Sequence, residues 1–435
     1  MTNRIKIIGG GLAGSDAAYY LAKKGYDIRL YDLKPDSFTP AHHNPDFGEL
    51  VCSNSLKSND VQGNACGLLK EELRILGSMV IASADHNKVP AGNSLSVNRE
   101  LFAKEITENL KSMPNIRFVS ENVKEFDLSE NVIVATGPLT TPELSKFISE
   151  LTGTEMYFFD AAAPIISADS VDMNCAYYGD RYGEPGIGDY INCPLDKAGY
   201  ENFYNELVNA KRAELHDFEN GKVFEGCMPV EVMAARGVDT LRFGPLKPVG
   251  LTDPKTGVRP YACLQLRKED AGGTMYNLVG FQTNLTFSEQ KRVFSIFPAL
   301  KNAEYYRYGV MHRNSYIRSP GVLKKDFSMI KYPNIFFAGQ IAGVEGYVES
   351  AAGGLLSAIN MDRRLSGKES VNLDNETVLG ALASYCETEN PDFQPMNANF
   401  GILAPLNRSI KDKTEKKRLF AERALEKIKA VKEIL

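Results

Sequence analysis

The chain has 435 residues, of which 43% are hydrophobic and 24% charged, and its formal net charge is −5. This composition is typical of a soluble globular protein of two or three domains, and the negative charge excludes a surface that is basic overall. No apolar run is long enough to span a bilayer, so we expect no membrane segment. The seven cysteines form no CxxC pair and no spacing typical of a metal site. Together with the absence of a signal peptide, this predicts reduced thiols, no metal and a cytoplasmic location.

The first predicted element is a short apolar strand, residues 5–8, which ends in Gly9-x-Gly11-x-x-Gly14. A helical pattern over residues 15–24 follows, so the motif has the strand–turn–helix context of a dinucleotide fingerprint. Gly9 would make the tight turn, Gly11 would let the backbone approach a pyrophosphate, and Gly14 would let the helix pack close to the strand. The helix N-terminus would then face the phosphates.

A second predicted strand, residues 27–32, ends in Asp32 about 20 residues after the glycines. This is where a carboxylate binds a ribose hydroxyl in dinucleotide folds. Leu12 and Ala13, inside the motif, are therefore also candidate cofactor contacts. An ordinary glycine-rich turn is the alternative, and the register of strand, helix and acid disfavours it.

Residues 36–66 are rich in Pro, Asn, Ser and His, which predicts a long ordered loop of the functional kind. Amphipathic helices are predicted over residues 67–76 and 98–111. Residues 132–138 form a buried strand that ends in Thr-Gly, with Gly137 at its end.

Near the C-terminus, residues 334–340 predict another buried strand, which ends in Gly339 and Gln340. A helical run over residues 351–363 follows, after a glycine segment that ends at Gly346 and Tyr347. A strand, a glycine and a helix in this order resemble the third flavin-binding element of two-dinucleotide flavoproteins. Such proteins usually carry Asp at the position of Gln340.

These elements predict an α/β fold, a Rossmann-like FAD-binding domain of the two-dinucleotide flavoprotein type, split by an α+β insertion domain. The predicted parts are residues 1–165, an insertion of residues 166–325 that binds RNA, and residues 326–435. Residues 407–435 contain ten Lys or Arg against five Asp or Glu, which predicts a basic C-terminal helix. A solvated helix face is the simpler explanation of this charge, and a nucleic-acid contact is the other.

Longer segments make the chain resemble one family, the folate- and FAD-dependent tRNA (uracil-5-)-methyltransferases (TrmFO). The resemblance runs nearly end to end and is far more specific than the glycine motif. Its segments are residues 9–14, 40–43, 49–56, 67–72, 135–138, 224–231, 242–251, 276–282, 308–314, 339–350 and 397–401.

The resemblance implies methylation of C5 of the uridine in the tRNA T-loop. Methylenetetrahydrofolate would give the carbon, and NADPH or NADH would give the electrons through FAD, with no obligate protein partner. Residues 59–67 and 90–99 depart from the family pattern, and some bacteria carry a paralogue that acts on ribosomal RNA, so the RNA target stays open. Two further readings are a flavoprotein that modifies the wobble uridine, for which the chain is short, and a flavin-bearing RNA-binding protein without turnover.

The chemistry needs a reactive cysteine, because uracil C5 becomes a nucleophile only after a thiolate adds to C6. Cys52 and Cys227 are the two cysteines in family-like segments. By analogy, Cys227 would add to C6, and Cys52 would remove the C5 proton or protect the flavin. The other five cysteines are predicted to be structural, since a small buried hydrophobe is the usual role of a free cysteine.

Other side chains could contact substrates, each with a structural alternative of similar weight. His42 and His43 could bind folate, flavin or RNA, or form a satisfied structural pair. Four cations could hold phosphates or form surface ion pairs, and two aromatic residues could stack on a ring or pack in the core. These are Arg242, Lys247, Arg313 and Arg318, and Phe281 and Tyr347.

Overall fold

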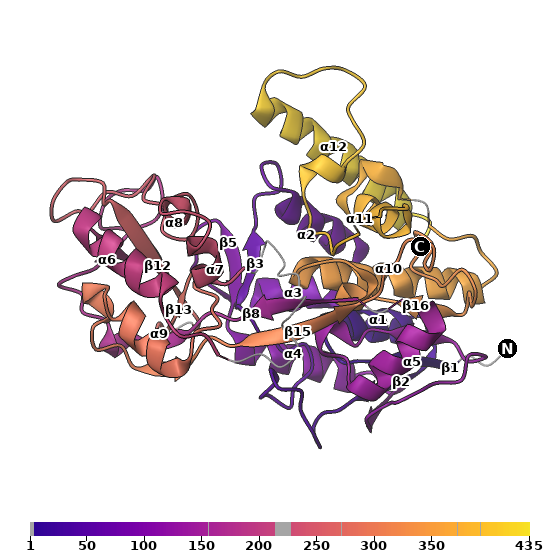
Figure 1. The fold of residues 1–435 in the computed structure, drawn as a ribbon. Helices are drawn as coiled ribbons and strands as arrows, with labels where there is room; N and C mark the ends of the chain where they lie inside the picture. The colour runs from indigo at the N-terminus through magenta and orange to yellow at the C-terminus, as the bar shows by residue number, and fades with distance from the viewer. Residues whose placement is uncertain (1–3, 155, 214–227, 271, 372, 392) are drawn as a thin grey trace.

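The protein forms two lobes in the computed structural model, which describes residues 4–154, 156–213, 228–270, 272–371, 373–391 and 393–435. One hydrophobic core draws on residues between Ile5 and Ile148 and between Ile317 and Val431, and we call this part the large lobe. A second core draws on residues between Ile166 and Ala303, the small lobe. Figure 1 shows the small lobe on the left and the large lobe on the right. The chain thus leaves the large lobe, builds the small one and returns.

A five-stranded sheet, in which all pairs are parallel, organises the large lobe. In spatial order its strands are β16 (Ile335–Phe337), β7 (Val132–Val134), β1 (Arg4–Ile8), β2 (Asp27–Asp32) and β6 (Ile116–Ser120). The strands are short and largely apolar because helices cover both faces of a parallel sheet. This sheet confirms the predicted Rossmann-like α/β fold.

The predicted helices of the large lobe are confirmed in type but differ at their ends, and three further helices, Met79–His86, Pro142–Thr152 and Val378–Glu387, were not predicted. Helix α1 (Leu12–Lys23) begins three residues earlier than predicted, because Gly11 already serves as its N-cap. Helix α10 (Tyr347–Leu365) also begins earlier than predicted, directly after Gly346. The others are α2 (Ala65–Leu76), α3 (Met79–His86), α4 (Arg99–Lys111), α5 (Pro142–Thr152), α11 (Val378–Glu387) and α12 (Lys413–Lys432). Both α1 and α10 pack beside the sheet, and their N-termini are near its carboxyl edge.

Two buried carboxylates hold helix starts in this lobe. Asp16 of α1 accepts hydrogen bonds from the Ser78 hydroxyl (2.5 Å) and the Met79 N–H (2.8 Å), at the start of α3. Glu72 of α2 accepts from the N–H groups of Val378 (2.8 Å) and Leu379 (2.9 Å), at the start of α11. Each carboxylate satisfies donors that a helix leaves free, so both have structural roles.

A smaller sheet in the large lobe lies close to the small lobe. Its strands, β3 (Ser55–Ser58), β5 (Ser94–Val97) and β4 (Lys88–Val89), are antiparallel. Strand β3 and the first two residues of α2 fall inside residues 36–66, so the loop prediction was wrong for these two parts. The strand forms because Ser55 and Ser58 pair with Ser96 and Ser94, a partner that the local sequence does not reveal.

The small lobe is an α+β unit built on a six-stranded sheet, as predicted for the insertion. Its strands, in spatial order, are β10 (Tyr177–Tyr178), β11 (Ile191–Leu195), β12 (Ala262–Lys268), β13 (Met275–Leu278), β9 (Ile165–Ser167) and β14 (Tyr305–Arg307). Its helices are α6 (Lys197–Val208), α7 (Val230–Ala234), α8 (Thr240–Phe243) and α9 (Phe287–Phe294). The domain limits at 165/166 and 325/326 stay a prediction.

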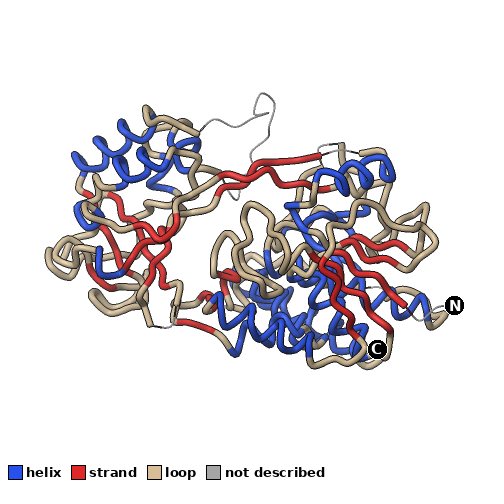
Figure 2. The backbone as a smooth tube through the Cα atoms, turned by 90° about the horizontal axis from the view of Figure 1, so that it is seen from below, coloured by secondary structure: helices blue, strands red, loops and turns tan. Residues whose placement is uncertain are grey.

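Two antiparallel strands, β8 (Met156–Ala161) and β15 (Met311–Tyr316), carry the chain into the small lobe and back. Figure 2 shows this pair of strands running between the lobes. The two lobes lie side by side, and residues of both line the cavity described below.

The C-terminal helix α12 packs on the large lobe. Phe420, Ala421, Ala424, Ile428 and Val431 form its buried face, and α2 lies beneath it. Several of its basic side chains are engaged: Arg423 donates to backbone carbonyls, Lys427 pairs with an aspartate, and Arg418 pairs with glutamates of the same helix. The main role of α12 is therefore to pack on the core of the large lobe. Among the described residues, no helix has both the length and the apolar character needed to cross a membrane.

Candidate active site

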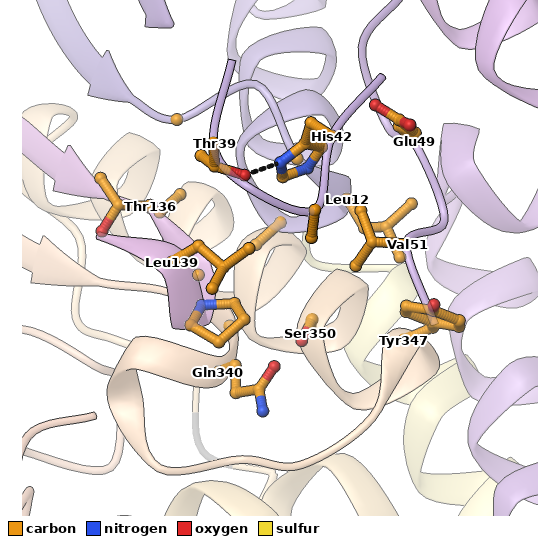
Figure 3. A pocket seen from close by; sticks show the side chains of 18 of the residues that line it. Leu12, Thr39, His42, Glu49, Val51, Thr136, Leu139, Gln340, Tyr347 and Ser350 are labelled. Carbon is orange, nitrogen blue, oxygen red and sulfur yellow. Dashed lines mark hydrogen bonds between the residues drawn. The ribbon is translucent and has the colours of Figure 1, made fainter. Parts of the chain in front are cut away.

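A cavity of about 470 Å³ opens at the carboxyl edge of the parallel sheet. Its walls come from the turns after β1, β7 and β16, the N-termini of α1 and α10, and the loop before β3. Figure 3 shows side chains of these segments around one space, with His42 and Leu12 on one side and Gln340 and Tyr347 on the other. In open α/β sheets this edge is the usual ligand site.

The glycine motif forms a bare backbone wall. Gly9 has a φ of +104°, and a Cβ there would lie 2.4 Å from the carbonyl oxygen of Ala135. A Cβ on Gly14 would lie 1.8 Å from the Gly9 oxygen, so this glycine allows the close packing predicted for it. A Cβ on Gly11 would meet no protein atom within 4 Å, since Gly11 faces the cavity. No side chain caps α1, which leaves its first N–H groups for a ligand.

Asp32 lies at the end of β2 and lines the same cavity. Its Oδ2 accepts the Gly10 N–H at 2.6 Å, and its Oδ1 accepts the Lys34 N–H at 3.0 Å. The carboxylate therefore orders the glycine turn, and its place at the cavity wall is compatible with a ribose contact.

Three more glycine turns complete this end of the cavity. Gly137 and Gly339 begin short 3₁₀ turns after β7 and β16, with φ of +64° and +77°, and Gly346 precedes α10. The Gln340 side chain, where related flavoproteins have Asp, donates to Glu345 at 2.5 Å. This bond orients the Gln340 side chain, which forms part of the cavity wall.

A buried carboxylate lies at the start of α10. Glu349 accepts the Ala398 N–H at 2.9 Å and pairs with Lys57 at 3.3 Å through the same oxygen, Oε1. Its Oε2 is buried and has no hydrogen-bond partner among the described residues. A polar ligand in the cavity would satisfy this oxygen, which fits a hydroxyl-bearing cofactor such as FAD better than an apolar one.

The loop that was predicted to be functional brings His42 into the cavity wall and leaves His43 exposed. The Thr39 hydroxyl and His42 Nδ1 are 2.6 Å apart (Figure 3). Burial and the nearby Lys34 ammonium lower the pKa of His42 to about 4, so the ring is neutral at pH 7. Glu49 accepts the His43 N–H at 2.9 Å and the Lys34 ammonium at 2.9 Å, which fixes the turn.

Cys52 lies at the other end of the cavity, on the loop that leads into β3. The Tyr347 hydroxyl accepts the N–H groups of Cys52 (2.8 Å) and Ser53 (3.1 Å), and burial raises the pKa of this phenol. Because Tyr347 is the first residue of α10, the Cys52 loop is tied to a helix that also borders the glycine turns. The Tyr347 phenol therefore positions the Cys52 loop. Stacking of its ring on a ligand stays a prediction.

The cavity brings together nearly all the predicted site residues. It is lined by Cys52 and by every predicted cofactor residue except Gly14, which lies beneath it: Gly9, Gly11, Leu12, Ala13, Asp32, Gly137, Gly339, Gln340, Gly346 and Tyr347. Their roles toward a ligand stay predictions. Cys227 lies outside the described residues, so the structure does not place it.

The remaining cysteines fit structural roles. Four of them are buried and one, Cys175, is partly buried: the buried ones are Cys66, Cys193, Cys263 and Cys386. Burial raises the pKa of the Cys66 thiol to about 11, which makes a thiolate unfavourable there. In the part of the chain that the structure describes, no group of His, Cys, Asp and Glu could hold a metal ion.

Two of the four candidate phosphate ligands have other partners. Arg242 lies 3.7 Å from the ring centroid of Tyr261 and donates to its carbonyl at 3.0 Å, and Arg318 pairs with Glu389. Lys247 is exposed, and the side chain of Arg313 is not described. Phe281 is fully buried in the small-lobe core, so its structural alternative is confirmed.

The structure adds cavity residues that the sequence analysis did not single out. These are Arg267 and Gln282 of the small lobe and Asn314 of the connecting strand β15. Gln282 and Asn314 end two of the family-like segments, which was the available signal for them. Nothing in the sequence around Arg267 pointed to the cavity, because its partners are more than 200 residues away.

Comparisons with known proteins agree with this geometry. The family model for glucose inhibited division protein A matches residues 4–369. The methylenetetrahydrofolate--tRNA-(uracil-5-)-methyltransferase TrmFO of Fusobacterium nucleatum is 52% identical over 430 residues, 99% of each chain. That of Bacillus licheniformis is 51% identical over 437 residues and covers 100% of both chains.

A solved structure of GidA from Aquifex aeolicus superposes with a TM-score of 0.72 at 15% identity, over 99% of this chain and 73% of that one. At this identity the likeness shows a shared fold. With the match to the family model over most of the chain and the relatives at about 52% identity, it leads to one conclusion: the chain belongs to the glucose inhibited division protein A family, and within it to the TrmFO proteins.

Proposed function

We propose that this protein is an RNA methyltransferase that forms 5-methyluridine in the tRNA T-loop, with methylenetetrahydrofolate as carbon donor and FAD and NADPH or NADH as redox cofactors. The observation that carries the proposal is the single cavity that joins Cys52 to four glycine turns. The full-length relatives at about 52% identity bear names of this activity, which supports the same conclusion.

The glycine end of the cavity would hold FAD. The α1 N-terminus and Gly11 would face the pyrophosphate, Asp32 a ribose, and the α10 N-terminus with Glu349 the polar edge of the flavin system. When bound, FAD would relay electrons from the nicotinamide and carry the one-carbon unit, chemistry that no side chain supplies.

The protein's own part is thiol and proton chemistry. The Cys227 thiolate would add to C6 of the uracil, which makes C5 a carbanion that bonds to the one-carbon unit. Removal of the C5 proton would release the carrier from the one-carbon unit and leave a methylene group on C5. Transfer of a hydride to this methylene would form the methyl group, expel the Cys227 thiolate and restore the C5–C6 double bond. Cys52, at the cavity wall, would take that proton.

RNA would approach from the side of the cavity that is lined by Gln282 of the small lobe and Asn314 of β15. A base must leave its stack to reach such a site. Exposed lysines at the start of α12, Lys411 and Lys413, could contact phosphates. A cytoplasmic location and the lack of an obligate protein partner remain part of this proposal.

The test uses purified protein with FAD, NADPH and methylenetetrahydrofolate labelled in the methylene carbon. We expect label in 5-methyluridine of a tRNA transcript, and none with a T-loop uridine-to-cytidine transcript. A parallel reaction with ribosomal RNA fragments tests the paralogue's activity: label there and not in tRNA would overturn the tRNA assignment. Equal methylation with S-adenosylmethionine in place of the folate would refute the proposed carbon source.

A further inference from the structure

The loop that carries Cys52 is held from the large lobe by two side chains. Tyr347 accepts two of its N–H groups, as described above. Arg99, the first residue of α4, donates to the carbonyls of Leu50 (3.0 Å) and Cys52 (3.4 Å). These bonds fix the loop backbone on both sides of the thiol.

The same loop is also held from the small lobe. Arg267 of β12 donates through Nη2 to the Ser53 hydroxyl at 2.6 Å and through Nε to Asn54 Oδ1 at 3.0 Å. Asn54, which is fully buried, donates back to the carbonyl of Lys268 at 2.8 Å. The two residues that follow Cys52 are therefore bonded to a central strand of the small-lobe sheet.

An ion pair closes this network across the lobes. Glu269, directly after β12, lies 2.7 Å from Arg99, and only 2% of its side chain is exposed. Arg267 is 8% exposed. Arg307 on β14 carries a third guanidinium group near this ion pair. Burial lowers its pKa, and the charges of Arg99 and Glu269 also act on it.

Buried charges are a costly way to join two lobes. Each buried ion loses its hydration, and apolar residues of the same volume often stabilise a protein as well or better. The charged network adds a defined orientation, because a planar guanidinium group donates to two acceptors at once in a fixed geometry. All of these bonds converge on residues 50–54.

We propose that Arg267 and the Arg99–Glu269 pair are positioning residues for Cys52, so that the placement of the small lobe sets the position of this thiol in the cavity. The inference rests on the proposed function in that it assigns Cys52 a role in the reaction. It extends that function by naming residues outside the cofactor motif on which Cys52 depends.

The test compares Arg267→Gln with Arg292→Gln in the flavin-loaded enzyme. Arg292 is an exposed ion-paired arginine of the same lobe, so its replacement controls for loss of a surface charge. We expect Arg267→Gln to lower kcat about 10-fold or more while flavin content and KM for tRNA stay within twofold. Arg292→Gln should leave all three unchanged.

A second readout does not need turnover. The rate of Cys52 alkylation by iodoacetamide is followed by peptide mass spectrometry at its high-pH plateau, where it reports accessibility, with Cys175 as internal reference. Arg267→Gln should raise the Cys52 rate at least threefold and leave the Cys175 rate unchanged. Ser53→Ala removes the 2.6 Å bond from Arg267 and the 3.1 Å bond from the Ser55 N–H. It should raise the Cys52 rate by less than Arg267→Gln does, and the double variant should show less than the sum of the two effects, because both variants remove the same Arg267–Ser53 bond.

Wild-type kcat and wild-type alkylation of Cys52 in folded Arg267→Gln protein would overturn the proposal. A general loss of flavin and thermal stability, with no change specific to Cys52 in either variant, would also overturn it by assigning Arg267 a purely structural role. If the wild-type enzyme shows no methyl transfer, the proposed function fails, and the alkylation rates still decide whether Arg267 positions the loop.

Discussion

At one end of the cavity the walls are backbone, formed by the glycine turns after β1, β7 and β16, whereas at the other end they are side chains that reach Cys52 from both lobes. The first end depends on close approach of main-chain atoms, as at Gly9 and Gly14. The second depends on the packing of one lobe against the other. A substitution at one end should therefore impair either FAD binding or the placement of Cys52 without impairing the other.

The largest expected effect is at the backbone-built end. Gly11→Val should abolish FAD binding, because the side chain would occupy the space for the pyrophosphate. The apo protein should fold normally, since a Cβ at Gly11 meets no protein atom within 4 Å. Flavin absorbance after purification and the melting temperature of the apo form measure the two effects.

Gly14→Val is the matched control, because its Cβ would collide with the Gly9 carbonyl. It should lower folded yield and flavin content together. Normal flavin content in Gly11→Val would show that the phosphates do not lie at this turn.

At the side-chain-built end, Cys52→Ala should lower methyl transfer about 100-fold or more, in the range of a lost general acid or base. Bound flavin should persist, since the cofactor turns do not involve this side chain. Steady-state kinetics and flavin content of the purified variant test this, with Cys175→Ala as the control. Unchanged turnover in Cys52→Ala would remove Cys52 from the reaction.

Truncation after residue 406 tests whether α12 belongs with the RNA surface or with the large lobe. Loss of its buried face should cost about 5 kcal/mol or more, at roughly 1.5–3 kcal/mol for each large apolar side chain. We therefore expect a lower melting temperature and lower folded yield. An intact melting temperature with weakened RNA binding would show that the helix serves RNA alone.

Lys411→Glu with Lys413→Glu separates charge from packing, because both side chains are exposed. This variant should keep the melting temperature. Its tRNA affinity should fall less steeply with salt if the two lysines contact phosphates.

The smallest effect concerns pH and His42. Its folded pKa of about 4 lies below the ordinary value of 6.5, so the unfolded chain binds the proton more readily. The free energy of unfolding should therefore rise with pH between about 4 and 6.5, by up to about 3 kcal/mol from this residue. Urea unfolding of the apo protein at pH 4.5 and pH 7 should show a smaller pH difference in His42→Asn. Equal pH differences in both proteins would contradict the burial of a neutral ring.

The two ends of the cavity also differ in how well they can be predicted from the sequence. The backbone-built end was predictable because glycine spacing and strand ends are local signals, as for Gly9 to Gly14 and Asp32. The start of α1 was missed because Gly14 reads as part of a turn, although it lies within the helix. At the other end Cys52 and Tyr347 were predicted, but Arg267 was not, because it contacts the Cys52 loop through tertiary packing from more than 200 residues away.

Trapping with 5-fluorouridine tests whether methyl transfer proceeds through addition of a thiol to the uracil. A T-loop RNA with 5-fluorouridine at the target is incubated with the flavin-loaded enzyme, NADPH and methylenetetrahydrofolate, and the product is mapped by mass spectrometry. Fluorine at C5 cannot leave as a proton does, so the account predicts a stable covalent RNA adduct on Cys227 that is lost in Cys227→Ala. Methylation of ordinary RNA with no adduct from the fluorinated RNA on Cys227 or Cys52 would contradict it.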